Sequence, residues 1–127
     1  FADEAMLQRF LKFDVLKDYL EARLKEVDEH NEGLGGDLSC LVNGRRLTNI
    51  GTYRAYCIAY LKKHPKIHPG MTFLVRQLAP TVHGVPIEIY VFCTDQNWVN
   101  YEGIQSDIFD HLLAVLSEFD LRAYQVP

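Results

Sequence analysis

The chain lacks most features of membrane-spanning and secreted proteins. No run of about 18 apolar residues occurs, so we expect no transmembrane helix in this part of the protein. The three cysteines, Cys40, Cys57 and Cys93, are an odd number without zinc-site spacing, so we expect reduced, structural thiols. No signal peptide is apparent. Because the chain begins at Phe1 without an initiator methionine, we expect it to be a piece of a longer protein.

A strong charge of either sign is also missing. The 13 basic and 17 acidic residues give a net charge of -4. This weak negative charge disfavours nucleic acid or an anionic lipid surface as the main partner, so we expect no nucleic-acid partner. The 127 residues are 48% hydrophobic and 24% charged, which is typical of a globular chain with its own core.

The first third of the chain carries a helical pattern. Apolar residues recur at steps of three and four, which predicts one long helix over residues 3–31. The glycine-rich stretch 31–36 predicts a connection after it. We therefore divide the chain into a helical insertion with its connection, residues 1–36, and an α+β domain, residues 37–127.

The second part is expected to alternate between strands and helices. Asn43-Gly44 favours a two-residue hairpin turn between the first two strands. Thr52 is the expected N-cap of the first helix. The predicted strands cover 38–42, 45–49, 72–78, 85–93 and 121–125. The predicted helices cover residues 53–64 and 103–119.

From residue 45 the predicted order is strand, helix, strand, strand, helix, strand. This order predicts an α+β fold of the split β-α-β (ferredoxin-like) type. Two helices would pack on one face of a small sheet, and the long helix would precede it. Phe109 is expected to be a core residue, so Phe109→Ala should cost about 3–5 kcal/mol. The core stripes of the two helices are Tyr53, Tyr56, Cys57, Tyr60, Leu61 and Ile104, Ile108, Leu112, Val115, Phe119.

A few polar residues have spacings that could bind a metal. On a helix starting near residue 103, Asp107 and His111 lie one turn apart, with Asp110 between them. The alternative is that Asp107 complements the helix dipole and His111 is partly buried. His64 and His68 are also four residues apart, but Pro65 prevents a shared helical face, so we interpret them as part of a rigid turn.

Catalytic motifs are missing from the sequence. There is no phosphate-binding loop, and no serine lies in a glycine-framed elbow. We therefore expect no enzyme activity, no catalytic residues, no cofactor and no metal. Trp98 and Tyr101 are expected to precede a helix and pack its start against the sheet, or else to anchor an interface. Arg45 and Arg46 are expected to be solvated or to contact another subunit.

Two stretches carry a resemblance to a known family. Residues 45–56, Arg-Arg-Leu-Thr-Asn-Ile-Gly-Thr-Tyr-Arg-Ala-Tyr, with 61–67, form the first. The second runs through residues 71–78, 86–92, 98–113 and 118–127. Together they resemble the C-terminal region of the mechanosensitive channel of small conductance (MscS) family, in its YbdG or miniconductance-type branch. The helix at 3–31 is similar to the insertion of that branch.

The resemblance implies a tension-gated channel of the bacterial inner membrane that responds to hypo-osmotic stress. Its membrane helices would precede Phe1, and this region would be cytoplasmic. It would form part of a vestibule and take part in assembly of a homo-oligomer, usually a heptamer, without a small-molecule substrate. Arg45, Arg46, Trp98 and Tyr101 would then serve subunit or domain contacts. The alternative is a small-molecule-sensing regulatory domain, because split β-α-β folds often bind ligands between subunits.

Overall fold

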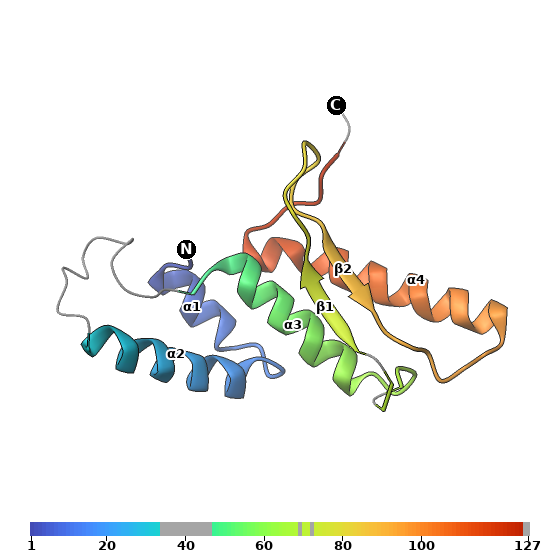
Figure 1. Cartoon of the computed structure of the whole chain (residues 1–127), viewed down its shortest axis with the longest axis horizontal. Coiled ribbons are helices and arrows are strands. Elements are labelled where there is room, and N and C mark those ends of the chain that lie inside the picture. The colour runs from blue at the N-terminus through green and yellow to red at the C-terminus, as the bar shows by residue number, and fades with distance from the viewer. Residues whose placement is uncertain (34–46, 69, 72, 126–127) are drawn as a thin grey trace.

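The computed structural model describes residues 1–33, 47–68, 70–71 and 73–125, and these form an α+β structure (Figure 1). The two strands make one antiparallel sheet. Figure 1 shows α1 and α2 at the end of the molecule where α3 begins. The elements are α1 (Glu4–Phe10), α2 (Lys17–Glu32), α3 (Asn49–Lys63), β1 (Leu74–Gln77), β2 (Ile87–Tyr90), α4 (Trp98–Ala114) and the 3-10 helix η1 (Val115–Phe119).

The single helix predicted over residues 3–31 is wrong, because the chain turns between α1 and α2. Backbone hydrogen bonds join Phe13 N to Phe10 O at 3.0 Å and Leu16 N to Phe13 O at 2.9 Å. The turn keeps Phe10 and Leu16 fully buried. The hydrophobic period therefore survives the turn, which explains why the sequence pattern did not reveal it.

The start of α3 lies four residues before the predicted one. Thr48, and not Thr52, is the N-cap, and its hydroxyl accepts a hydrogen bond from Gly51 N at 3.0 Å. A Cβ on Gly51 would lie 2.9 Å from that hydroxyl, so glycine leaves room for the cap. Asn49 is already helical, which shortens the strand predicted over residues 45–49. Leu47 and Thr48 are not in a strand either, so the described part of the strand predicted over residues 45–49 is wrong. Residues 45–46, the strand over 38–42, the turn between these strands and the domain boundary at residue 36 lie outside the described residues.

The predicted hairpin is confirmed, although its strands are shorter than expected. β1 and β2 are antiparallel, with Val75 opposite Ile89. At the tip, Thr81 and Gly84 exchange backbone hydrogen bonds of 2.8 and 3.0 Å, and Gly84 has a φ of 103° that favours glycine. Val75 and Ile89 belong to the core cluster, whereas the opposite face of the sheet is open to solvent.

The last helix begins earlier than predicted and exposes Phe109. α4 starts at Trp98 because the Asn97 side chain accepts hydrogen bonds from Val99 N and Asn100 N at 3.1 and 3.3 Å. Ile108 and Leu112 are buried on the predicted stripe. Phe109 lies about 100° around the helix from Ile108 and is 47% exposed, so its expected place in the core is wrong.

The predicted final strand is also wrong, because residues 121–125 have no regular structure. Asp120 adopts a left-handed conformation with a φ of 54°, and Leu121 N then bonds back to Leu116 O at 3.1 Å. The chain therefore leaves η1 in a turn. It rises beside the hairpin tip toward the C-terminus (Figure 1).

The core is centred on Phe119, which is fully buried. Its ring centroid lies 5.0 Å from that of Phe10, 5.5 Å from Phe13, 5.4 Å from Tyr53 and 5.5 Å from Tyr56. These rings come from α1, the turn after it, α3 and η1. The N-terminal helices are therefore joined to the rest of the chain by one aromatic cluster.

Candidate interaction surface

The possible metal site around His111 does not form in the described part of the chain. There, no group of three or more His, Cys, Asp or Glu side chains could hold a metal ion. Because α4 begins at Trp98, Asp107 lies in its third turn and does not complement the dipole of the first turn. Both interpretations of Asp107 are thus wrong, whereas the partial burial of His111 is confirmed.

His111 instead joins α4 to α3 through two tyrosines. The Tyr56 hydroxyl and His111 Nε2 share a hydrogen bond of 2.6 Å, and the Tyr60 ring stacks on His111 with centroids 4.2 Å apart. Burial raises the pKa of Tyr56, and burial followed by the negative charge of Asp107 raises the pKa of Tyr60. Both hydroxyls therefore stay protonated near neutral pH, which suits a structural role.

His64 and His68 stabilise turns. Their Nδ1 atoms accept hydrogen bonds from Lys66 N and Gly70 N, each at 3.1 Å. In each case the Nδ1 atom accepts the hydrogen bond from the backbone N–H two residues later in the chain. This geometry agrees with the predicted turn.

Cys57 lies where a thiol is unreactive. Its side chain is fully buried, and burial raises its pKa from 9.0 to about 11. Burial also raises the pKa of the neighbouring Tyr53, whose hydroxyl donates to Leu112 O at 2.7 Å. A nucleophilic cysteine needs a lowered pKa and access to solvent, so Cys57 has neither property.

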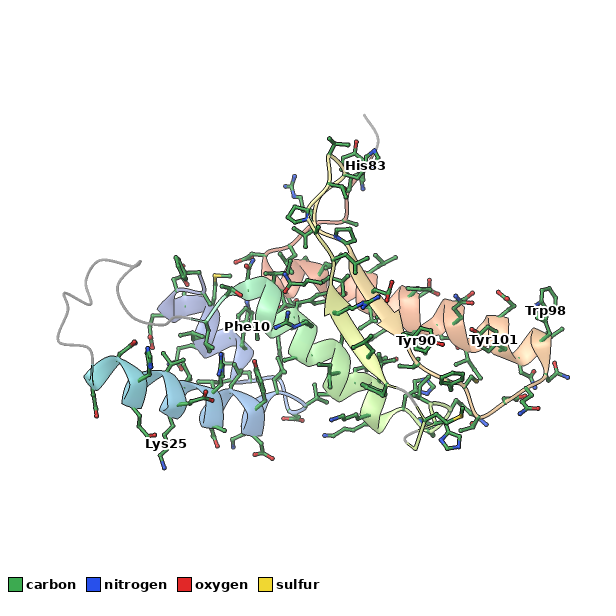
Figure 2. All side chains as sticks on the ribbon, in the orientation of Figure 1. Phe10, Lys25, His83, Tyr90, Trp98 and Tyr101 are labelled. Atoms are coloured by element: carbon green, nitrogen blue, oxygen red, sulfur yellow. The ribbon has the colours of Figure 1, made fainter. Side chains whose placement is uncertain are left out.

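Trp98 and Tyr101 lie inside α4 and not before it. Trp98 is 72% exposed at the first turn, and Tyr101 is 41% exposed one turn later (Figure 2). Packing of the helix start against the sheet is therefore wrong for Trp98. An interface role for Trp98 and Tyr101 stays a prediction, and Tyr101 also lines a hollow between β2 and α4. Arg45 and Arg46 lie outside the described residues.

Other exposed apolar side chains escaped the sequence analysis. Val99, next to Trp98, is 70% exposed, and Val82 at the hairpin tip is 90% exposed. Leu113, one turn after Phe109, is 56% exposed. For Val82, the sequence did contain a signal of exposure, because the residue lies within the predicted turn of the hairpin.

Two hollows follow one another between β2 and α4. The larger, of about 1130 Å³, lies between the hairpin, α4 and residues 121–125. The smaller, of about 90 Å³, lies between β2 and the first half of α4. Ile89 and Phe109 line both, so the hollows meet at these two residues. We call the two together the β2–α4 groove.

No protein-family model matches the chain, and no solved structure matches it. Among the helices that the structure describes, none combines the length and the apolar character needed to cross a bilayer.

Proposed function

We propose that the chain is the cytoplasmic C-terminal domain of a tension-gated channel of the mechanosensitive small-conductance family, where it forms part of a vestibule and supports subunit assembly. The observation that carries this proposal is the apolar start of α4, where Trp98 and Val99 are mainly exposed in the single chain. Adjacent exposed apolar side chains favour a contact with another surface, and aromatic residues are enriched in such contacts. A homo-oligomeric ring, usually a heptamer, would supply that surface.

The sequence resemblance adds to this support. The stretches that carry it fall on α3, on the hairpin and on α4, which are the elements that form the α+β core. The parent protein would be anchored in the bacterial inner membrane by segments upstream of Phe1. Tyr56, Tyr60 and His111 pack together, Cys57 is buried, and His64 and His68 hold turns, so these side chains have structural roles.

The split β-α-β arrangement belongs to the same proposal. The observed order of α3, β1, β2 and α4 equals the middle four elements of that pattern. A two-stranded sheet is marginal by itself, which gives the assembled protein a physical reason to extend it.

The first test is membrane fractionation of the intact parent protein. An antibody raised against this chain follows the protein through a wash with alkaline carbonate. Retention in the washed membranes is expected for a channel subunit, and patch-clamp recording under pressure is then the functional test. Release of all the parent protein by carbonate would refute the channel proposal.

The second test concerns assembly through α4. In the full-length protein, Trp98→Asp places a charge on the proposed contact and should reduce the chemically cross-linked oligomer. Tyr19→Asp on α2 is the matched control, since Tyr19 is 40% exposed and lies far from α4 in the chain. Equal cross-linking of both variants and the unchanged protein would show that the start of α4 is not a subunit contact.

A small-molecule sensor is the second candidate, and the larger hollow of about 1130 Å³ favours it. A ligand at concentration [L] would raise the stability by RT ln(1 + [L]/Kd). A thermal-shift screen with amino acids and osmolytes should then find a saturable rise in melting temperature. The absence of any shift would eliminate this candidate.

A further inference from the structure

The edge of β2 that faces away from β1 has backbone N–H and C=O groups without hydrogen-bond partners among the described residues. Leu78 N bonds to Pro86 O at 2.9 Å, and bonded pairs alternate along an antiparallel ladder. The register therefore directs the backbone groups of Glu88 and Tyr90 toward β1, and those of Ile87 and Ile89 away from it. No described residue hydrogen-bonds to these outward groups of Ile87 and Ile89.

This free edge borders the β2–α4 groove. Ile87 and Ile89 line the larger hollow, and Ile89 also lines the smaller one. Phe109 and Leu113 of α4 form the opposite wall and are about half exposed. With a volume of about 1130 Å³, the larger hollow has room for a peptide segment as well as for a small molecule. A free strand edge facing an apolar helix wall is the arrangement that accepts an added strand.

The charges of the groove restrict what it would bind. None of the described residues that line either hollow is acidic, although the whole chain has a net charge of -4. The larger hollow is lined by Arg122, with no ion-pair partner among the described residues, and by His83. His83, at the hairpin tip (Figure 2), packs against Tyr124 with ring centroids 5.0 Å apart, so the segment that carries Arg122 runs to the hairpin-tip end of the groove.

From this geometry we propose that the β2–α4 groove binds an extended peptide strand of another protein, which pairs with the free edge of β2. Alternate apolar side chains of the peptide face Phe109 and Leu113. One carboxylate of the peptide lies at the end with Arg122, where the groove has no acidic residue to repel it. The outward groups of Ile87 and Ile89 supply the backbone hydrogen bonds. The proposal does not use the channel function, but it requires that the edge of β2 that faces away from β1 stays unpaired in the assembled protein.

The test selects phage-displayed random 12-residue peptides on the immobilised chain, and selected sequences are then synthesised. We expect enrichment of alternating apolar positions with one Asp or Glu. Binding should move the amide NMR signals of Ile87 and Ile89 and slow their hydrogen exchange. Failure to enrich any such sequence overturns the proposal. The same holds if both amides are already protected in the free chain, because the chain itself then fills the groove.

Variants locate the binding site. Phe109→Asp should weaken the selected peptide by about tenfold or more, since it places a carboxylate on the apolar wall. Tyr19→Asp is the matched control, because Tyr19 is also an exposed aromatic residue but lies on α2 and does not line the groove. Arg122→Glu should weaken the acidic peptide and strengthen its Lys-substituted counterpart. Equal binding by the Phe109→Asp and Tyr19→Asp variants would place the peptide elsewhere and refute the proposal.

Discussion

Truncation of two phenylalanines near the end of the chain should give opposite results. Phe119 is fully buried and contacts four aromatic rings, whereas Phe109 is 47% exposed. Phe119→Ala removes a ring from a closed cluster, and such a deletion costs about 3–5 kcal/mol. At roughly 4 °C per kcal/mol for a chain of this size, the melting temperature should fall by about 12–20 °C.

The expected cost at Phe109 is much smaller. Full burial of a phenylalanine side chain contributes about 1.5–3 kcal/mol, and only about half of this ring is covered, which leaves about 1 kcal/mol. Alanine has the higher helix propensity, which offsets up to about 0.7 kcal/mol of that loss. Phe109→Ala should therefore change the free energy of unfolding by less than about 1 kcal/mol.

Urea unfolding followed by circular dichroism measures both changes on the same scale. Phe119→Leu is a third variant in case Phe119→Ala does not fold, since it keeps most of the volume and should cost about 1–1.5 kcal/mol. If Phe109→Ala costs as much as Phe119→Ala, the assigned faces of α4 and η1 are wrong. A loss below about 1 kcal/mol for Phe119→Ala would show that the aromatic cluster does not hold the helices together.

Three further predictions concern α3. Thr48→Ala should lower the free energy of unfolding by about 0.5–2 kcal/mol, because it removes the hydroxyl that accepts the hydrogen bond from Gly51 N. Thr48→Ser keeps a hydroxyl at this position and should retain most of the stability. Equal losses in the two variants would refute the role of Thr48 as the cap. Tyr53→Phe should cost about 0.5–1.5 kcal/mol, because it removes the buried hydrogen bond to Leu112 O, and unchanged urea unfolding would contradict that bond. Cys57 should resist iodoacetamide in the folded chain and react in urea, as read by peptide mass spectrometry. The pKa of the Cys57 thiol is about 11 in the folded chain and 9.0 in the unfolded chain. The contribution of this thiol to folding stability is therefore complete below pH 9.0 and is lost as the pH rises through 11. Rapid alkylation of Cys57 near neutral pH would refute its burial.

The sequence predicted the presence of the hairpin and of the two later helices better than the residues at which they begin and end. The hairpin and both later helices occur, and the buried positions of α4 follow the predicted stripe at Ile108 and Leu112. The predicted starts of α3 and α4 lie too late in the chain, because the prediction placed the cap of α3 at Thr52 instead of Thr48 and did not identify Asn97 as the cap of α4. Side-chain capping depends on local geometry that several nearby polar residues could satisfy.

Exposure was harder to predict than periodicity. A stripe shows which residues share a helix face, but the width of the buried sector depends on what packs against it. Phe109 lies at the margin of the stripe, where the described elements leave it 47% exposed. The sequence predicts an anchoring role for Trp98 and Tyr101, but it does not show that both side chains are exposed, because their exposure depends on the start of α4 at Trp98, directly after the cap Asn97.

The two ends of the described structure are packed in different ways, and this difference bears on both proposals. Around Phe119, aromatic rings from three parts of the chain close the core, and the Arg9 side chain also pairs with Asp120 at 3.1 Å. Between β2 and α4, two hollows and a free strand edge leave apolar surface uncovered. New contacts in that groove would add burial without displacing native packing, so a bound chain gains more there than at the aromatic cluster. The aromatic cluster thus holds the scaffold, and the β2–α4 groove is the place where another polypeptide can complete it.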